Sequence, residues 1–174
     1  MPYGGRSAVE SALRLISNDP PVQDFVPRTI ELRGGFTLRA PIARVFPLFS
    51  PLGERSWVPD WEPELLDPFG ASWERGQVFR TDEGGREAVW LVTLLDPAAY
   101  EVEYHRVCSG RYVARVAVHC RSESDDGTGV DVSYRFVGLS PEGNAEIEIM
   151  TPEAYRQKME RWKEWIETRA LAGA

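Results

Sequence analysis

The chain has 174 residues, of which 43% are hydrophobic and 27% are charged, and these proportions predict one globular domain with its own core. A formal net charge of −7 would repel the phosphate backbone of nucleic acids, so we expect no nucleic-acid partner. The longest strongly apolar run, residues 88–95, is far shorter than the roughly 20 residues of a membrane span, and no secretory signal is recognised, which predicts a cytoplasmic protein without a membrane span.

Residues 1–28 are predicted to be an N-terminal extension, because residues 7–16 have helical spacing that the following prolines interrupt. We expect this extension to be partly helical or disordered. The domain proper, residues 29–172, opens with an alternating strand at 29–33, which 36–38 continue beyond a bulge suggested by Gly34 and Gly35. A short proline-started helix follows at residues 40–46.

Five further strands are predicted between residues 77 and 137, separated by segments rich in turn-forming residues. They cover residues 77–81, 88–95, 100–107, 111–121 and 128–137. Alternation gives this antiparallel meander an apolar, aromatic inner face and a charged outer face. A three-residue loop at 108–110 would place Tyr104 opposite Ala114 and Glu103 opposite Arg115.

A short helical piece between residues 140 and 150 leads into a long C-terminal helix. Thr151 is its predicted N-cap and Pro152 its first helical residue. Its apolar stripe contains Tyr155, Met159, Trp162, Trp165, Ile166 and Ala170. Because the apolar face of the sheet is the surface available to bury this stripe, we expect the helix to lie across it.

Several segments resemble one known superfamily. Residues 36–46 resemble the opening strand and helix of the SRPBCC superfamily, which includes START lipid-transfer domains, birch-pollen-allergen-like proteins and polyketide cyclases. Residues 51–63, PLGERSWVPDWEP, look like a segment found in one uncharacterised bacterial branch, and 76–81, Trp90, 102–104, 132–134 and Trp162 follow in the expected order. The resemblance covers about residues 29–170 and implies an α+β helix-grip fold. In that fold a curved antiparallel sheet of about six to seven strands wraps around the C-terminal helix, with two short helices after the first strand.

The resemblance also implies a hydrophobic cavity between the sheet and the helix. We therefore expect this monomer or homodimer to bind a small apolar or aromatic molecule, lipid-like or polyketide-like. The alternatives are a cyclase or dehydratase, in which cavity tyrosines and a carboxylate such as Glu54 or Asp60 act as acid and base, and an interaction module resembling chaperone activators. An exposed, continuous apolar patch on the outer face would favour the module.

Candidate ligand contacts come from the tryptophan-rich segment, the inner face of the sheet and the terminal helix. They are Glu54, Trp57, Trp61, Phe79, Trp90, Tyr104, Arg106, Tyr112, Tyr134, Met159 and Trp162. The competing interpretation is that the tryptophans plug one end of the domain, that Glu54 pairs with Arg55, and that the inner aromatics form a solid core. Arg106 either pairs with Glu54 or Asp60, binds an anionic ligand group, or reaches solvent at the strand end, which we favour.

No motif identifies catalytic residues, a metal site or a cofactor. Phosphate loops, dinucleotide-binding glycines, HExxH and a Ser-His-Asp order are missing from the sequence. Cys108 and Cys120 form no CxxC pair, and we expect them to be free thiols without zinc. His105 and His119 are predicted on the outer face, His119 opposite Asp131, where they have no cavity to serve.

Overall fold

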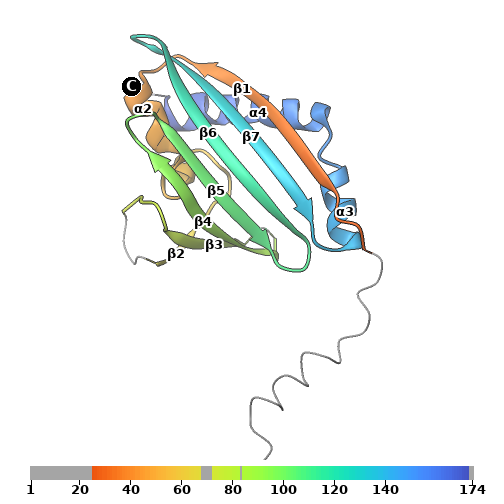
Figure 1. Ribbon diagram of the computed structural model, residues 1–174. Coiled ribbons are helices and arrows are strands. Elements are labelled where there is room, and N and C mark those ends of the chain that lie inside the picture. Colours follow the sequence, from red (N-terminus) through yellow and green to blue (C-terminus); the bar gives the residue numbers. More distant parts are fainter. Residues whose placement is uncertain (1–24, 68–71, 83, 173–174) are drawn as a thin grey trace, which may run out of the picture.

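The computed structural model describes residues 25–67, 72–82 and 84–172. Within them, seven strands form one curved antiparallel sheet in the order β1-β7-β6-β5-β4-β3-β2 (Figure 1). The strands are β1 (Thr29–Leu38), β2 (Glu64–Asp67), β3 (Val78–Asp82), β4 (Glu87–Asp96), β5 (Glu101–Cys108), β6 (Tyr112–Ser124) and β7 (Gly127–Gly138). The predicted N-terminal extension falls almost entirely outside the described residues.

Three α-helices and three shorter helical turns complete the described fold. They are α2 (Ile42–Val45), the 3₁₀ turns η1 (Phe46–Phe49) and η2 (Gly53–Ser56), α3 (Pro141–Glu148), α4 (Pro152–Trp165) and the terminal π-turn η3 (Ile166–Ala170). No helix among the described residues is both long and apolar enough to cross a lipid bilayer.

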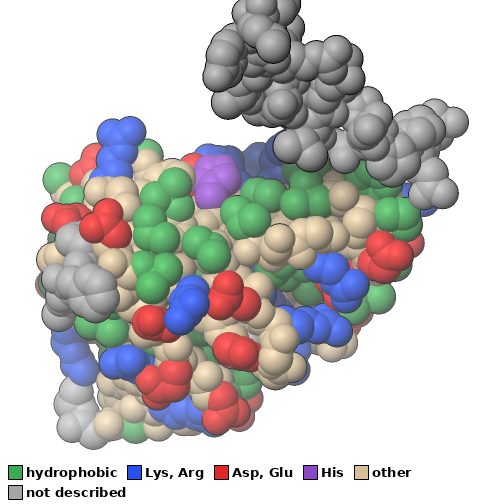
Figure 2. All heavy atoms as spheres, turned by 90° about the horizontal axis from the view of Figure 1, so that it is seen from below, with side chains coloured by type: hydrophobic (Ala, Val, Ile, Leu, Met, Phe, Trp, Pro, Cys, Tyr) green, Lys and Arg blue, Asp and Glu red, His purple; other side chains and the backbone are tan. Residues whose placement is uncertain are grey.

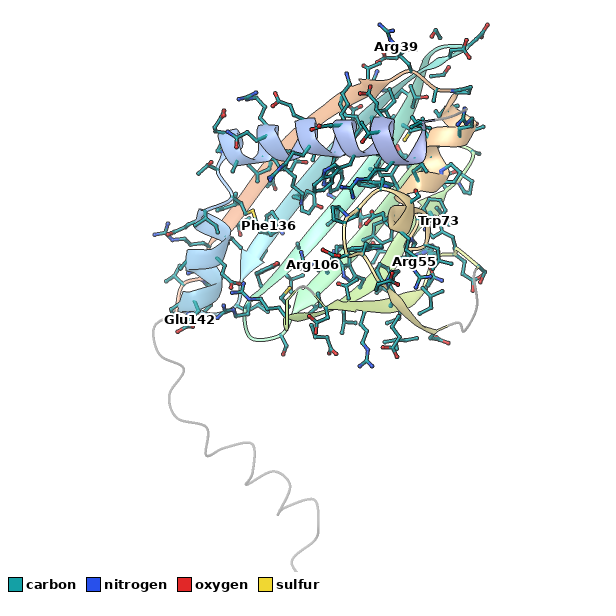
Figure 3. The ribbon with its side chains drawn as sticks, turned by 180° about the vertical axis from the view of Figure 1, so that it is seen from behind. Arg39, Arg55, Trp73, Arg106, Phe136 and Glu142 are labelled. Carbon is teal, nitrogen blue, oxygen red and sulfur yellow. The ribbon has the colours of Figure 1, made fainter. Side chains whose placement is uncertain are left out.

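Helix α4 crosses the concave face of the sheet, as its apolar stripe predicts (Figures 1 and 3). The Thr151 hydroxyl caps its first turn by accepting a hydrogen bond from the Ala154 amide at 3.1 Å. Tyr155, Met159 and Trp162 are buried beneath the helix. The helix and the inner face of the meander therefore share one hydrophobic core.

Strand β1 has no bulge, so this part of the sequence prediction is wrong. Its register with β7 runs without a shift from Thr29 opposite Val137 to Leu38 opposite Thr128. The two glycines serve close packing instead. A Cβ atom on Gly34 would lie 3.1 Å from Tyr155 Cε1 on α4 and 3.2 Å from Met159 Cγ.

The pairing of β5 with β6 differs from the predicted register by two residues. Tyr104 lies opposite Val116 and Glu103 opposite Ala117, because the turn between the strands consists of residues 109–111 rather than 108–110. Gly110 still supplies the left-handed turn conformation, with φ of 67°. A shift of two residues leaves every side chain on its predicted face.

Two further features of the sheet are not evident in the sequence pattern. The four-residue strand β2 pairs with β3 at one edge of the sheet. The register shifts between Val92 and Leu94 in the β4–β5 pair, and two further shifts lie in the β2–β3 and β6–β7 pairs, so irregularities occur in the sheet but not in β1. His119 lies opposite Asp131 as predicted.

A candidate ligand-binding cavity

A cavity of about 340 Å³ lies between the concave face of the sheet and α4. Its wall is built from residues 51–63, called here the Trp loop, from the β3–β4 turn, and from the inner faces of β3 to β7. The lining residues are Pro51, Glu54, Val58, Pro59, Asp60, Trp61, Glu62, Phe79, Thr81, Asp82, Gly84, Trp90, Tyr104, Arg106, Val116, Val118, Tyr134, Lys158 and Trp162.

Aromatic rings form one continuous wall of this cavity. Phe79 and Trp90 are paired across β3 and β4, and their rings stack with centroids 5.6 Å apart and an interplanar angle of 8°. Tyr104 meets both rings edge-on, at 6.1 and 6.2 Å, and Trp61 of the Trp loop meets Trp90 edge-on at 5.7 Å. The cross-strand register thus produces a large apolar surface of fixed geometry.

Two of the tryptophans that line the cavity donate their indole N–H groups to other groups of the protein. Trp61 Nε1 donates to the Pro51 carbonyl at 2.7 Å, and Trp90 Nε1 donates to Thr81 Oγ1 at 2.9 Å. Such contacts fix the rings while leaving their apolar faces available to a ligand.

The Trp loop leaves η1 through a tight turn at Gly53. A Cβ atom there would lie 2.1 Å from the Pro47 carbonyl oxygen, so this position requires glycine. Trp57 is fully buried and donates to the Leu48 carbonyl at 2.8 Å. Its ring meets Trp162 edge-on at 5.2 Å, which positions Trp162 at the cavity wall.

The Tyr104 hydroxyl is held in a donor role at the back of the cavity. It donates to the Phe49 carbonyl at 2.7 Å. Burial raises the pKa of this phenol well above its usual value, and the negative charge of Glu54 adds to the shift. Tyr104 therefore stays neutral at physiological pH and does not serve as a base.

Lys158 on α4 lines the cavity, a placement that the sequence interpretation missed. Its Nζ lies 3.2 Å from the Tyr134 hydroxyl, 4.4 Å from the centre of the Tyr134 ring and 5.0 Å from that of Trp162. The spacing of Lys158 could have placed it on the apolar side of the helix, because it follows Tyr155 by three positions and precedes Trp162 by four.

Arg106 also lines the cavity, instead of reaching solvent at the strand end as we favoured. Figure 3 shows it projecting from the sheet on the face that α4 crosses. Its guanidinium carbon lies 5.1 Å from the Trp90 ring centre and 5.6 Å from that of Tyr112. Contacts of this kind with two ring faces stabilise a cation within an aromatic wall.

The competing interpretation paired Glu54 with Arg55. Arg55 lies 3.1 Å from the Glu62 carboxylate, while Glu54 lines the cavity. The lining residues Asp60, Glu62 and Asp82 are exposed, so carboxylates gather at the cavity rim. Asp60 has a φ of 55°, the left-handed conformation that aspartate tolerates better than most residues.

Three of the candidate ligand contacts belong to the packed core and not to the cavity wall. Trp57 supports Trp162 as described above, Tyr112 meets Phe136 edge-on at 5.7 Å, and Met159 packs at Gly34. The other eight candidates line the cavity. That these residues contact a ligand stays a prediction.

The outer face of the sheet carries a few partly exposed hydrophobic side chains. Val89, Leu91, Leu94 and Val107 are 38–40% exposed. Leu91 lies opposite His105 and Leu94 opposite Glu103, so polar residues interrupt the group. This interrupted pattern favours the cavity over the outer face as the functional site. Seen from below, the molecule shows hydrophobic side chains interspersed with charged ones (Figure 2).

No protein-family model and no curated protein matches the sequence. Solved structures do match. Norcoclaurine synthase from Thalictrum flavum, in complex with dopamine and hydroxybenzaldehyde, has a TM-score of 0.59 and 11% identity over 97% of this chain and 96% of that one. The ZhuI aromatase/cyclase from Streptomyces sp. R1128 has a TM-score of 0.59 and 20% identity, covering 86% of this chain and all of its own. The di-domain ARO/CYC BexL of the BE-7585A biosynthetic pathway has a TM-score of 0.60 and 19% identity, covering 80% of this chain and 46% of its own. These similarities confirm the helix-grip fold that the sequence resemblance predicted.

Proposed function

We propose that the protein binds a small aromatic molecule in the cavity between the sheet and α4. The observation that carries this proposal is the cavity of about 340 Å³ with its fixed aromatic wall. Sites for small molecules commonly measure roughly 300–1,000 Å³ and combine apolar walls with a few oriented polar groups. A planar ligand would release water from these ring faces, which supplies the main favourable free energy of binding.

The structural neighbours support this ligand class. One of them is described in complex with two aromatic compounds, and two others are aromatase/cyclases. At identities of 11–20% these similarities concern the fold, so the chemistry of the cavity itself has to carry the assignment. That chemistry is aromatic, which favours ring-bearing ligands over flexible lipid chains.

A cavity-filling substitution tests the proposal. Val118 lies on the inner face of β6 and lines the cavity, so Val118→Trp would occupy part of the ligand volume. We expect at least a tenfold loss of affinity for 2-acetonaphthone, measured by quenching of tryptophan fluorescence, with the fold retained in circular dichroism. Val89→Trp on the outer face is the matched control and should bind as the wild type does. Unchanged binding by folded Val118→Trp would contradict the proposal.

A cyclase-type activity is the second candidate, and the position of Glu54 favours it. Its carboxylate lines the cavity close enough to Tyr104 to raise the pKa of that phenol. A carboxylate beside a bound ketone can take a proton from the carbon next to the carbonyl, the first step of an aldol-type ring closure. NMR in D2O would show accelerated exchange of the methyl hydrogens of 2-acetonaphthone with the wild type and not with Glu54→Gln. Equal rates for the two proteins would exclude Glu54 from this role.

A further inference from the structure

The outer face of the sheet carries a row of valines that crosses four neighbouring strands. Valine is paired with valine at each step of this row, which consists of Val89 on β4, Val107 on β5, Val113 on β6 and Val137 on β7. Val89 and Val107 are 38% and 40% exposed, and the other two are partly exposed. Polar residues separate the apolar side chains along the strands, but across the strands the valine row is continuous. At a strand spacing of about 4.8 Å, it is about 14 Å long.

Helix α4 leaves the valine row uncovered. The helix crosses the concave face, and Figure 1 views the sheet from the outer side with α4 behind it. Two exposed leucines adjoin the row. Leu91, 39% exposed, follows Val89 by two residues, and Leu139, 44% exposed, follows Val137 by two residues. Another apolar surface that covered this strip would release water from it, which is favourable, so the row is a candidate docking surface.

The chain enters the domain at one end of the valine row. Thr29, the first residue of β1, lies opposite Val137. The segment just before Thr29 is held in place by α3, because the Asn144 side chain donates a hydrogen bond to the Val26 carbonyl at 3.0 Å. Residues 1–24, which lie outside the described residues, are therefore attached to the domain beside the row.

The sequence of residues 7–16 offers an apolar surface that matches the row in length. Val9, Leu13 and Ile16 recur at helical spacing, and a helix over this range would be about 15 Å long. Residues 17–24 can span up to roughly 26 Å when extended, so they can bring such a helix to any part of the row. Attachment to the same chain makes the contact intramolecular, so a weak apolar interaction is sufficient.

We propose that residues 7–16 form a helix whose apolar side docks on the valine row. The N-terminal extension then covers the outer face of the sheet, opposite the face that holds the cavity. Charge favours this segment over a second copy of the chain as the occupant. Two copies would each bring a formal net charge of −7 to the contact, whereas residues 7–16 carry Glu10 and Arg14 and are neutral overall.

Hydrogen exchange of the full chain, followed by mass spectrometry, tests this inference. In the wild type, we expect the amides of residues 7–16 to exchange at least about tenfold more slowly than an unstructured chain of the same sequence. Val107→Lys places a charge within the row, and Leu13→Lys places one within the docking helix. Each substitution should return the exchange to the unstructured rate. Leu13→Lys leaves the sequence of the domain unchanged, so it gives a clear result even if Val107→Lys disturbs the sheet.

Leu94→Lys is the matched control. Leu94 is 39% exposed on the outer face of β4, but it lies outside the row, opposite Glu103. This variant should keep the slow exchange. Exchange of wild-type residues 7–16 at the unstructured rate, or slow exchange that survives both Val107→Lys and Leu13→Lys, overturns the inference. Slow exchange that appears only at concentrations where light scattering gives twice the mass of one chain would assign the row to a second copy and overturn it as well.

Discussion

The two halves of the concave face differ in how closely they pack against α4. On the β1–β7 side, Gly34 lets Tyr155 and Met159 come into contact with the strand, and the Tyr155 hydroxyl is bonded to β7. On the β3–β5 side, rings such as Phe79 and Trp90 cover the strands, and the cavity remains between them and the helix. A close-packed half therefore fixes α4, and this leaves the other half open for a ligand.

The largest expected effect comes from removing the close approach at Gly34. Gly34→Leu would place side-chain atoms where Tyr155 and Met159 now lie, and overpacking of this kind should lower the free energy of unfolding by about 3 kcal/mol. Urea denaturation measures this change. Thr37→Leu, on the exposed outer face of the same strand, should change the stability by less than about 0.5 kcal/mol. Equal stabilities of the two variants would show that the β1 half is not closely packed.

A matched pair of hydroxyl deletions compares the packed contact between α4 and β7 with the cavity wall. Tyr155→Phe removes a buried hydrogen bond to the Val132 carbonyl and should destabilise the protein by about 2 kcal/mol. Tyr134→Phe removes a hydroxyl that lines the cavity and lies 3.2 Å from Lys158 Nζ. Water in the cavity can solvate the ammonium in its place, so this variant should cost less, about 1 kcal/mol. Thermal unfolding of both variants checks the difference. A larger loss of stability in Tyr134→Phe would show that the cavity wall, and not the contact between α4 and β7, contributes more to stability.

The smallest expected effect is a pH dependence that comes from a buried thiol of the core. Burial, with a contribution from Asp131, raises the pKa of the Cys120 thiol from 9.0 to about 12. The folded state then holds this proton more tightly than the unfolded state, so the contribution to stability is complete below about pH 9 and is lost as pH rises towards 12.

Between pH 8 and pH 10, the wild type should therefore lose about 1 kcal/mol more stability than Cys120→Ala does. Urea midpoints of both proteins at the two pH values give this difference, in which the titration of the tyrosines cancels. Parallel pH profiles would mean that the Cys120 thiol is accessible to water in the folded state.

The faces of the strands could be predicted from the sequence, whereas their registers could not. Alternation along β5 and β6 placed Tyr104 and Tyr112 inside, and a register error of two residues left them there. The register depended on which residues form the turn at Gly110, and a single sequence permits both choices. Gly34 and Gly35 suggested a bulge, because glycine is found both where a strand bends and where another element packs closely against the strand. The sequence alone does not distinguish these two cases.

The aromatic part of the cavity wall followed from the strand faces, but its polar part did not. Trp61, Phe79 and Trp90 line the cavity. They could be predicted as candidates because the strands and the Trp loop that carry them are evident in the sequence. Lys158 was passed over because a lysine at the edge of an apolar stripe is normally a solvent-exposed neighbour of the core. The edge of α4 that carries Lys158 faces a cavity because of where the Trp loop and Tyr134 lie. Tertiary packing sets these positions, and the sequence pattern does not show them.

The indole hydrogen bonds of the Trp loop have a consequence for binding kinetics. Trp57 and Trp61 are hydrogen-bonded to the Leu48 and Pro51 carbonyls of the chain itself, so we expect the loop to lose little conformational entropy when a ligand binds. Association should then be a single step whose observed rate rises linearly with ligand concentration in stopped-flow measurements. Crystals of the protein should also tolerate ligand soaking without cracking, since we expect the Trp loop to keep its shape when a ligand binds.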